Sequence, residues 1–276
     1  MIDLHLHTTA SDGRCAPGEL VDRVARAGIT VMAVTDHDTT AALSEVHACA
    51  SQRGIVAVSG IEITAVEDGR DVHMLGYFLD PAEPGLIQFL ESQRATRVAR
   101  VHRIAARLSE LGVPIDLHAL LEEAERNPGR SIGRPQVARA LQSAGHVANT
   151  TEAFDRFLAS GGPAFVSRPG SPPEVVTGII HRAGGLASLS HPGRTRIDAR
   201  IAALAAAGLD GLEVYHPDHD AAAVERYRRL ASDLGLLMTG GSDYHGDPAH
   251  GIEPGASTLP PLEWRQLSEA RRRHAR

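Results

Sequence analysis

The sequence predicts an α/β protein built as a closed barrel of parallel strands, and three observations support this fold class. Short apolar runs alternate with helical stretches along most of the 276 residues, which is typical of a parallel α/β architecture. Histidine, aspartate or glutamate accompanies the end of each apolar run, where a strand would finish. Glycines end several helical stretches just before the next strand, as C-terminal capping residues do: Gly28, Gly54, Gly208 and Gly235.

The N-terminal part supplies four predicted strands and two helices. The strands are expected at 2–7 (IDLHLH), 30–38 (TVMAVTDHD), 55–64 (IVAVSGIEIT) and 71–79 (DVHMLGYFL). The helices are expected at 16–28 and 40–54, between the first three strands. The third and fourth strands lie close together in the sequence.

Three further strands are expected after a gap, at 184–193 (GGLASLSHPG), 208–219 (GLDGLEVYHPDH) and 235–246 (GLLMTGGSDYHG). Alanine- and arginine-rich helical segments follow the first two. In a closed barrel of parallel strands, the carboxyl ends form one rim, which is where such barrels keep their chemistry. We therefore place the barrel domain in residues 1–79 and 167–276.

Residues 80–166 interrupt the alternation. They begin with the proline-containing DPAEPG and continue as ESQRATRVARVHRIAARLSELG, in which apolar residues recur at helical spacing. DLHALLEEAE and RPQVARALQSAG predict further helices. We expect a helical insertion over one side of the barrel mouth, acting as a lid and specificity element. The alternative is a purely structural elaboration.

Composition limits the class of protein. The formal net charge of −6 argues against a basic surface that coats nucleic acid, although a small basic pocket is compatible with it. All 28 Lys+Arg positions are arginine, which a GC-rich coding bias explains most simply. Cys15 and Cys49 are too few for a disulfide framework, so we expect a reducing cytoplasm. We expect neither a signal peptide nor a membrane span.

The first predicted strand carries two histidines, His5 and His7, that point to the same face because they are two residues apart. Two imidazoles directed at one point suggest a shared metal ion. Similar residues stand at the other strand ends and would converge on the same rim. They are Asp36, His37, Asp38, Glu62, His73, His191, His216, Asp243 and His245. Such a gathering predicts a metal site.

The motifs resemble those of the PHP (polymerase and histidinol phosphatase) superfamily of metal-dependent phosphoesterases. The matching stretches are DLHLHTTASDG, TDHDT, GIEIT, HMLGYF, SHPGR, EVYHPDH and GSDYHG, in that order on both sides of the insertion. The resemblance implies a distorted (β/α)7 barrel with up to three metals at the strand carboxyl ends.

The resemblance also implies three sets of metal ligands. The first set is His5, His7, Glu62 and Asp243. In the second set Glu62 bridges to a metal that also binds His73 and His191. The third set is Asp12, His37 and His245. Histidine and carboxylate donors accept Mn²⁺, Fe²⁺ or Zn²⁺, so two to three divalent ions of one of these elements are expected.

Such a cluster lowers the pKa of a bound water toward ~7 and polarises a phosphoryl oxygen. Asp12 and His216 are the candidate proton-handling catalytic residues. Arginine binds phosphate in bidentate fashion, and Arg134, Arg168 and Arg194 are the candidate substrate-binding residues. The alternative is that these arginines are ordinary surface residues.

Within the superfamily, the layout is similar to nucleoside 3′,5′-bisphosphate phosphatases and related 5′-to-3′ exoribonucleases. This resemblance implies removal of the 3′-phosphate from a 3′,5′-bisphosphonucleotide or hydrolysis of short 5′-phosphorylated RNA, with Arg134 and Arg194 reading the 5′-phosphate. Two alternatives stay open. One is a phosphatase of a small metabolite such as histidinol phosphate, and the other is a non-catalytic PHP module. With few aromatic residues, we expect no long single-stranded or duplex nucleic acid as a partner.

Overall fold

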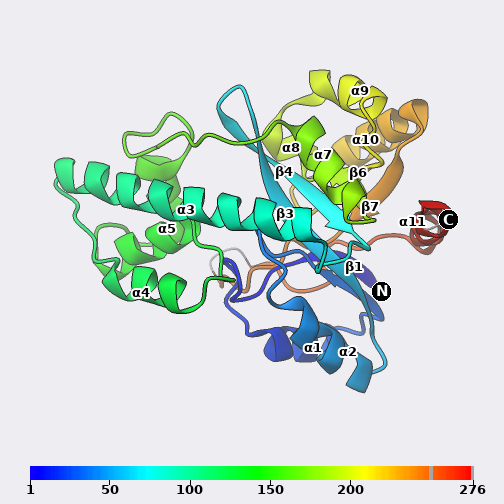
Figure 1. Cartoon of the computed structure of the whole chain (residues 1–276), viewed down its shortest axis with the longest axis horizontal. Coiled ribbons are helices and arrows are strands. Elements are labelled where there is room, and N and C mark those ends of the chain that lie inside the picture. The colour runs from blue at the N-terminus through cyan, green and yellow to red at the C-terminus, as the bar shows by residue number, and fades with distance from the viewer. Residues whose placement is uncertain (249–250, 275–276) are drawn as a thin grey trace.

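The computed structural model describes residues 1–248 and 251–274. Seven strands form one sheet in sequence order (Figure 1). They are β1 (Ile2–Leu6), β2 (Val31–Val34), β3 (Val56–Glu67), β4 (Arg70–Tyr77), β5 (Leu186–Leu189), β6 (Gly211–Tyr215) and β7 (Leu237–Gly240). A parallel bridge between Leu6 and Tyr244 brings the end of β1 beside the segment that follows β7. The sheet is therefore a nearly closed barrel, and the predicted fold class is confirmed.

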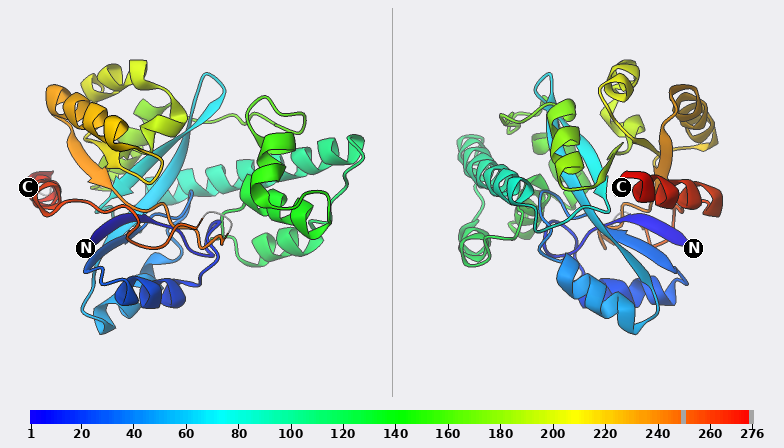
Figure 2. Two further views of the ribbon diagram at one scale, coloured as in Figure 1. Left: turned by 180° about the vertical axis from the view of Figure 1, so that it is seen from behind. Right: turned by 45° about the vertical axis from the view of Figure 1, so that its right-hand side comes forward.

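Helices cover the outside of the sheet on two sides. The pair α1 (Pro17–Arg26) and α2 (Leu43–Gln52) packs on β1 and β2, through a cluster that includes Leu6, Val21 and Val34. On the other side lie α7 (Pro173–Arg182), α8 (Pro192–Thr195), α9 (Asp198–Ala206) and α10 (Ala221–Leu234), and α11 (Pro261–His274) ends the described chain (Figure 2).

Local sequence explains where α10 begins and ends. The side chain of Asp220 accepts a hydrogen bond from the backbone N–H of Ala223 at 2.8 Å, which satisfies one of the unpaired donors of the first turn. At the other end Gly235 adopts φ = 67°, the left-handed conformation that glycine takes without strain. The expected stop at Gly235 is confirmed.

The expectation of an all-parallel sheet was wrong at β4. This strand pairs antiparallel with both β3 and β5, while the other neighbours are parallel. Asp68 and Gly69 join β3 to β4 in a two-residue turn with φ of 48° and 74°. Positive φ at both residues matches the right-handed twist of a hairpin, and Asp-Gly is a typical sequence for it. In Figure 1 this hairpin rises beyond the other strands.

The reversal of β4 explains how His73 reaches the rim. In a parallel strand the rim lies at the carboxyl end, but in β4 it lies at the start. His73 is in the first half of β4 and pairs with Thr64 of β3. His73, near the start of β4, therefore lies at the same rim as the residues at the carboxyl ends of the parallel strands.

Residues 84–158 are mostly helical and stand to one side of the barrel (Figures 1 and 2). They form α3 (Pro84–Glu110), α4 (His118–Arg126), α5 (Arg134–Ser143), α6 (Thr150–Ala153) and the π-helix η1 (Phe154–Leu158). The start of α3 packs on the barrel through Leu86 and Leu90, whereas Val101 and Ile104 belong to a separate apolar cluster of this segment. The division of the chain at 80 and 167 into two domains stays a prediction.

Candidate active site

Histidines and carboxylates at the rim form three overlapping groups, each of which could hold a metal ion. We call these groups together the histidine–carboxylate cluster. Within each group the donor atoms lie within 4.8 Å of one another. The groups are His5, His7, Glu62 and Asp243; His37, Glu62 and His73; and His7, Asp12, His37 and His245. The residues of the first group are those expected for the first ligand set.

Glu62 lies at the centre of the cluster. Its Oε2 is 3.3 Å from Nε2 of His5 and 3.1 Å from Nδ1 of His37. Its Oε1 is 3.0 Å from Nδ1 of His73 and 3.1 Å from Nε2 of His191. A fully buried carboxylate in contact with histidines on both oxygens has the arrangement needed to bridge two cations.

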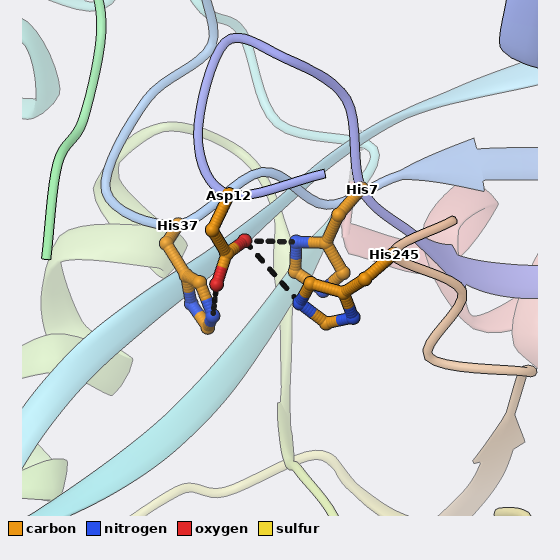
Figure 3. Close-up of side chains that lie close together, drawn as sticks. All are labelled: His7, Asp12, His37 and His245. Atoms are coloured by element: carbon orange, nitrogen blue, oxygen red, sulfur yellow. Dashed lines mark ion pairs between the residues drawn. The ribbon is translucent and has the colours of Figure 1, made fainter. Parts of the chain in front are cut away.

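The third group surrounds Asp12, as Figure 3 shows. Its Oδ1 lies 3.2 Å from Nε2 of His245 and 3.8 Å from Nδ1 of His7, and its Oδ2 lies 3.5 Å from Nε2 of His37. Compared with the expected third set, His7 is an additional member. His7 and His37 each belong to two of the three groups, which sequence spacing does not reveal.

A close backbone approach places Asp12. A Cβ atom at position 13 would lie 2.4 Å from the carbonyl oxygen of His7, so only glycine lets the loop after β1 fold back at this point. The buried carboxylate of Asp36 then holds the loop by accepting hydrogen bonds from Thr8 N–H at 2.8 Å and Ser11 Oγ at 2.5 Å. Asp36 therefore lies at the rim, as expected, and its carboxylate holds the loop after β1.

The donor set fits divalent cations. Several buried ring nitrogens form no hydrogen bond within the described residues, including both of His7 and Nδ1 of His191. The His5 Nδ1–H donates to Glu213 at 2.8 Å, so in the neutral ring the lone pair on Nε2 would face carboxylate oxygens of Glu62 and Asp243 at 3.3 and 3.2 Å. Lone pairs and carboxylates facing one another repel unless a proton or a cation lies between them.

Protonation states differ across the cluster. Burial lowers the pKa of His37 to about 3 and of His191 to about 4, which leaves both rings neutral and able to act as ligands. Burial opposes charge on His245 as well, but Asp12 and Asp243 raise the pKa of His245 to about 9. A cation that binds Asp12 and His245 would displace this proton.

His216 is buried beside the first group. Its Nε2 lies 3.3 Å from Oδ2 of Asp243, and its Nδ1 accepts the backbone N–H of Asp218 at 3.1 Å. A neutral His216 therefore carries its ring proton on Nε2, which faces the cluster. Arg194 contacts the same aspartate, with Nη1 3.3 Å from Oδ2 of Asp243, and its side chain is 56% exposed.

Arg134 and Arg168 lie elsewhere, around the base of the insertion. Arg134 Nη2 is 3.0 Å from Oδ2 of Asp71, and its guanidinium lies over the rings of Phe154 and Phe165 at 5.7 Å. Arg168 is buried and donates from Nη2 to the carbonyl oxygen of Thr64 at 2.9 Å. Neither residue is an ordinary surface arginine.

Sequence reasoning missed two further arginines at this place. Arg97 donates to Asp38 and, from Nη2, to Thr64 Oγ1 at 2.7 Å. Arg100 donates from Nη1 to Asp71 Oδ2 at 2.7 Å. We call Arg97, Arg100, Arg134 and Arg168 the arginine cluster. The sequence signal for these two residues is RATRVAR, where arginines recur at every third residue of α3.

The arginine cluster carries more positive than negative charge. Its four guanidinium groups contact two carboxylates, Asp38 and Asp71. Buried N–H groups on Arg100 and Arg168 have no hydrogen-bond partner among residues 1–248 and 251–274. Burial, and to a lesser extent the neighbouring arginines, lowers the pKa of Arg134 to about 10. An anion would satisfy both the charge and the unpaired donors.

Comparisons with known proteins agree with this geometry. The PHP domain family matches residues 3–154. A 3′,5′-nucleoside bisphosphate phosphatase from Chromobacterium violaceum is 36% identical, with 98% of this chain and 97% of that protein covered. A 5′-3′ exoribonuclease from Haemophilus influenzae is 34% identical over 88% of this chain and 89% of that protein.

A solved structure from Bifidobacterium adolescentis, provisionally assigned as a metal-dependent phosphoesterase, superimposes with a TM-score of 0.87 at 33% identity and covers 96% of this chain and 94% of that one. The resemblance expected from the motifs is confirmed, and the chain belongs to the PHP domain family.

Proposed function

We propose that the protein is a metal-dependent phosphoesterase that removes the 3′-phosphate of nucleoside 3′,5′-bisphosphates and hydrolyses short 5′-phosphorylated RNA from its 5′ end. The observation that carries this proposal is the pairing of a metal-binding feature with an anion-binding one. The histidine–carboxylate cluster and the arginine cluster share the β3–β4 hairpin, with Glu62 in the first and Thr64 in contact with the second. A substrate with phosphates at both ends of one nucleoside would engage both.

The proposed metal ligands combine the three groups with His191, which contacts Glu62 but belongs to none of them. His5, His7, Glu62 and Asp243 hold the first ion; Glu62, His73 and His191 hold the second, with His37 nearby; and Asp12, His37 and His245 hold the third. Two to three Mn²⁺, Fe²⁺ or Zn²⁺ ions suit these donors. When bound, they supply a hydroxide from water and neutralise charge on the scissile phosphate.

The arginine cluster binds the 5′-phosphate in this proposal. Guanidinium groups donate in pairs to phosphate oxygens, and buried donors without partners gain most from an incoming anion. Arg194 was expected to read the same phosphate as Arg134. Because it contacts Asp243, we now assign Arg194 to the phosphate at the histidine–carboxylate cluster.

His216 and Asp12 have different roles in this proposal. His216 directs Nε2–H at the leaving 3′ oxygen and stabilises the charge developing there by a hydrogen bond, since Nδ1 accepts a backbone N–H and the ring proton therefore stands on Nε2. Asp12 serves as a metal ligand, because burial alone would raise its pKa but its contact with His245 keeps that pKa well below the usual range and the carboxylate ionised. An ionised carboxylate has no proton to donate.

We propose a cytoplasmic location on the basis of the free cysteines. Cys15 and Cys49 are unpaired, which suits a reducing compartment. Among the described helices, none combines the length and apolar character needed to cross a membrane.

Phosphate release from 3′,5′-bisphosphoadenosine in the presence of Mn²⁺, Fe²⁺ or Zn²⁺ tests the proposal. The Asp243→Asn variant, which lacks one proposed metal ligand, is measured beside the wild type, and histidinol phosphate is the alternative substrate. We expect turnover of the nucleotide that the variant loses. Release only from histidinol phosphate would favour the small-metabolite phosphatase. No release from either substrate with any of the three metals would contradict the proposed enzyme.

A further inference from the structure

We propose that Glu213 and His219 are positioning residues that hold two of the metal-binding histidines, His5 and His191, in the orientation a metal requires. Both belong to the EVYHPDH motif on and after β6, in which the proposed function uses His216 alone. The inference rests on the proposed metal centre. Neither residue is proposed as a metal ligand, because neither belongs to any of the three ligand groups.

Glu213 is completely buried and uses both of its oxygens. Oε1 accepts from Nδ1–H of His5 at 2.8 Å. Oε2 accepts from the backbone N–H of His191 at 2.7 Å and from Ser190 Oγ at 3.1 Å. One carboxylate thus contacts a residue of the first proposed ligand set and a residue of the second.

The contact with His5 fixes the tautomer and the ring orientation. A proton held on Nδ1 leaves the lone pair of Nε2 directed at Glu62 and Asp243. Carboxylates in this relation to a ligating histidine orient the ring and increase its basicity toward the metal. Without Glu213, His5 can rotate or shift its proton to Nε2, where it would block coordination.

The contact with His191 supports a strained backbone. His191 has φ = 25° and ψ = 63°, a region that residues with a Cβ atom rarely occupy and that persists only where surrounding contacts hold it. The amide of His191 is fixed by Glu213, and two residues later the amide of Gly193 donates to Nε2 of His219 at 3.2 Å. Both supports of the turn therefore come from β6 and the segment after it.

His219 is itself held in place. Its Nδ1–H donates to the carbonyl oxygen of Val214 at 2.9 Å, so its Nε2 is left as an acceptor for Gly193. The approach is close: a Cβ atom at position 193 would lie 2.8 Å from Cδ2 of His219. The ring therefore acts on the turn carrying His191, whereas Glu213 acts on both His191 and His5.

Titration of the metal-stripped full chain with Co²⁺ tests the inference. Calorimetry measures the affinity, and the visible absorption of the bound ion reports its ligand geometry. Glu213→Gln should lower Co²⁺ affinity by roughly 10–100-fold and alter the spectrum. Glu263→Gln is the matched control, because Glu263 is also buried but bonds Tyr215 Oη at 3.0 Å and belongs to no ligand group. It should bind Co²⁺ as the wild type does.

Two substitutions at His219 separate shape from hydrogen bonding. His219→Phe keeps a ring without an acceptor and should weaken Co²⁺ binding at the His191 site by about tenfold. His219→Gln restores an acceptor and should recover most of the affinity. Circular dichroism in EDTA shows whether each variant folds without metal. If Glu213→Gln does not fold, the His219 pair decides alone.

Folded Glu213→Gln and His219→Phe proteins with the affinity and spectrum of the wild type would overturn the inference. A wild-type chain that binds no Co²⁺ would overturn it together with the metal centre. Failure of the proposed function has a different result: the wild type binds Co²⁺ but releases no phosphate from 3′,5′-bisphosphoadenosine. The positioning roles would then still be decided by the Co²⁺ affinities.

Discussion

Nε2 of His216 lies 3.3 Å from Oδ2 of Asp243, with its proton directed at the histidine–carboxylate cluster. As a hydrogen-bond donor to the leaving oxygen, His216 matters most when the leaving group is a strong base. We expect His216→Phe, which keeps a ring but has no donor, to lower kcat on 3′,5′-bisphosphoadenosine by about 10²–10³-fold, the range typical of removing one such donor. On 4-nitrophenyl phosphate, whose leaving group needs no proton, the loss should be far smaller. Equal losses on both substrates, at equal metal content, would contradict the assignment.

The arginine cluster predicts a dependence on the 5′-phosphate. Removing one charged hydrogen-bond donor costs about 1.5–3 kcal/mol, or roughly 10–150-fold in affinity. Arg100→Gln and Arg134→Gln should therefore raise KM for 3′,5′-bisphosphoadenosine by at least tenfold, but leave KM for adenosine 3′-phosphate nearly unchanged. Arg156→Gln is the control, since Arg156 is half-exposed and pairs with Glu152. A rise of the same size for both substrates would argue against a 5′-phosphate site.

Packing within the insertion predicts a stability difference along α3. Ile104 is completely buried, whereas Ile87 on the same helix is 42% exposed. Ile104→Ala should lower the free energy of unfolding by about 2–5 kcal/mol, because it removes buried methyl groups and leaves a cavity. Ile87→Ala should cost less than about 1 kcal/mol. Urea denaturation of the two variants gives the comparison, and similar midpoints would show that the apolar cluster is loosely packed.

The pair of His181 and Asp210 predicts a pH dependence of stability remote from the metal ligands. His181 Nε2 donates to Asp210 Oδ2 at 2.6 Å, and this bond raises the pKa of His181 above its usual value. A histidine with a raised pKa in the folded state stabilises fully below its unfolded pKa of about 6.5, and this stabilisation is lost as pH rises through the folded pKa. Since the His181 side chain is 31% exposed, the effect should be below about 1 kcal/mol.

Measurement of unfolding free energy between pH 5 and 9 in wild type and His181→Gln checks this expectation. The difference between the two should shrink as pH rises. A difference that grows with pH would show that the neutral ring, and not the ion pair, makes the stabilising contact.

The sequence was sufficient to predict the barrel and the residues at its rim. Each of His5, Glu62 and Asp243 follows or ends an apolar run, and the geometry of a barrel brings such positions together. The direction of β4 was missed because an alternation of strands and helices was extended over a place with no helix. The Asp68–Gly69 dipeptide was the local signal for the hairpin.

Long-range packing hid the remaining features of the site. Arg97 and Arg100 are visible as regularly spaced arginines, but which side of α3 faces the hairpin depends on tertiary contacts. In the sequence, Glu213 cannot be distinguished from any other polar residue within a predicted strand. Its importance appears only when His5, 208 positions away in the sequence, is placed against it. A role that depends on a contact with a residue far away in the sequence cannot be predicted from the spacing of residues along the sequence.

Closure of the barrel through Leu6 and Tyr244 has a consequence for folding. These residues lie at opposite ends of the chain, whereas the β3–β4 hairpin is joined by two residues and can form locally. Contacts between distant residues carry a high loop-closure cost and form slowly. The first ligand set combines His5 and His7 with Asp243, so it is complete only once the two ends have met. A metal ion bound there would stabilise this long-range contact and oppose opening of the barrel between β1 and β7.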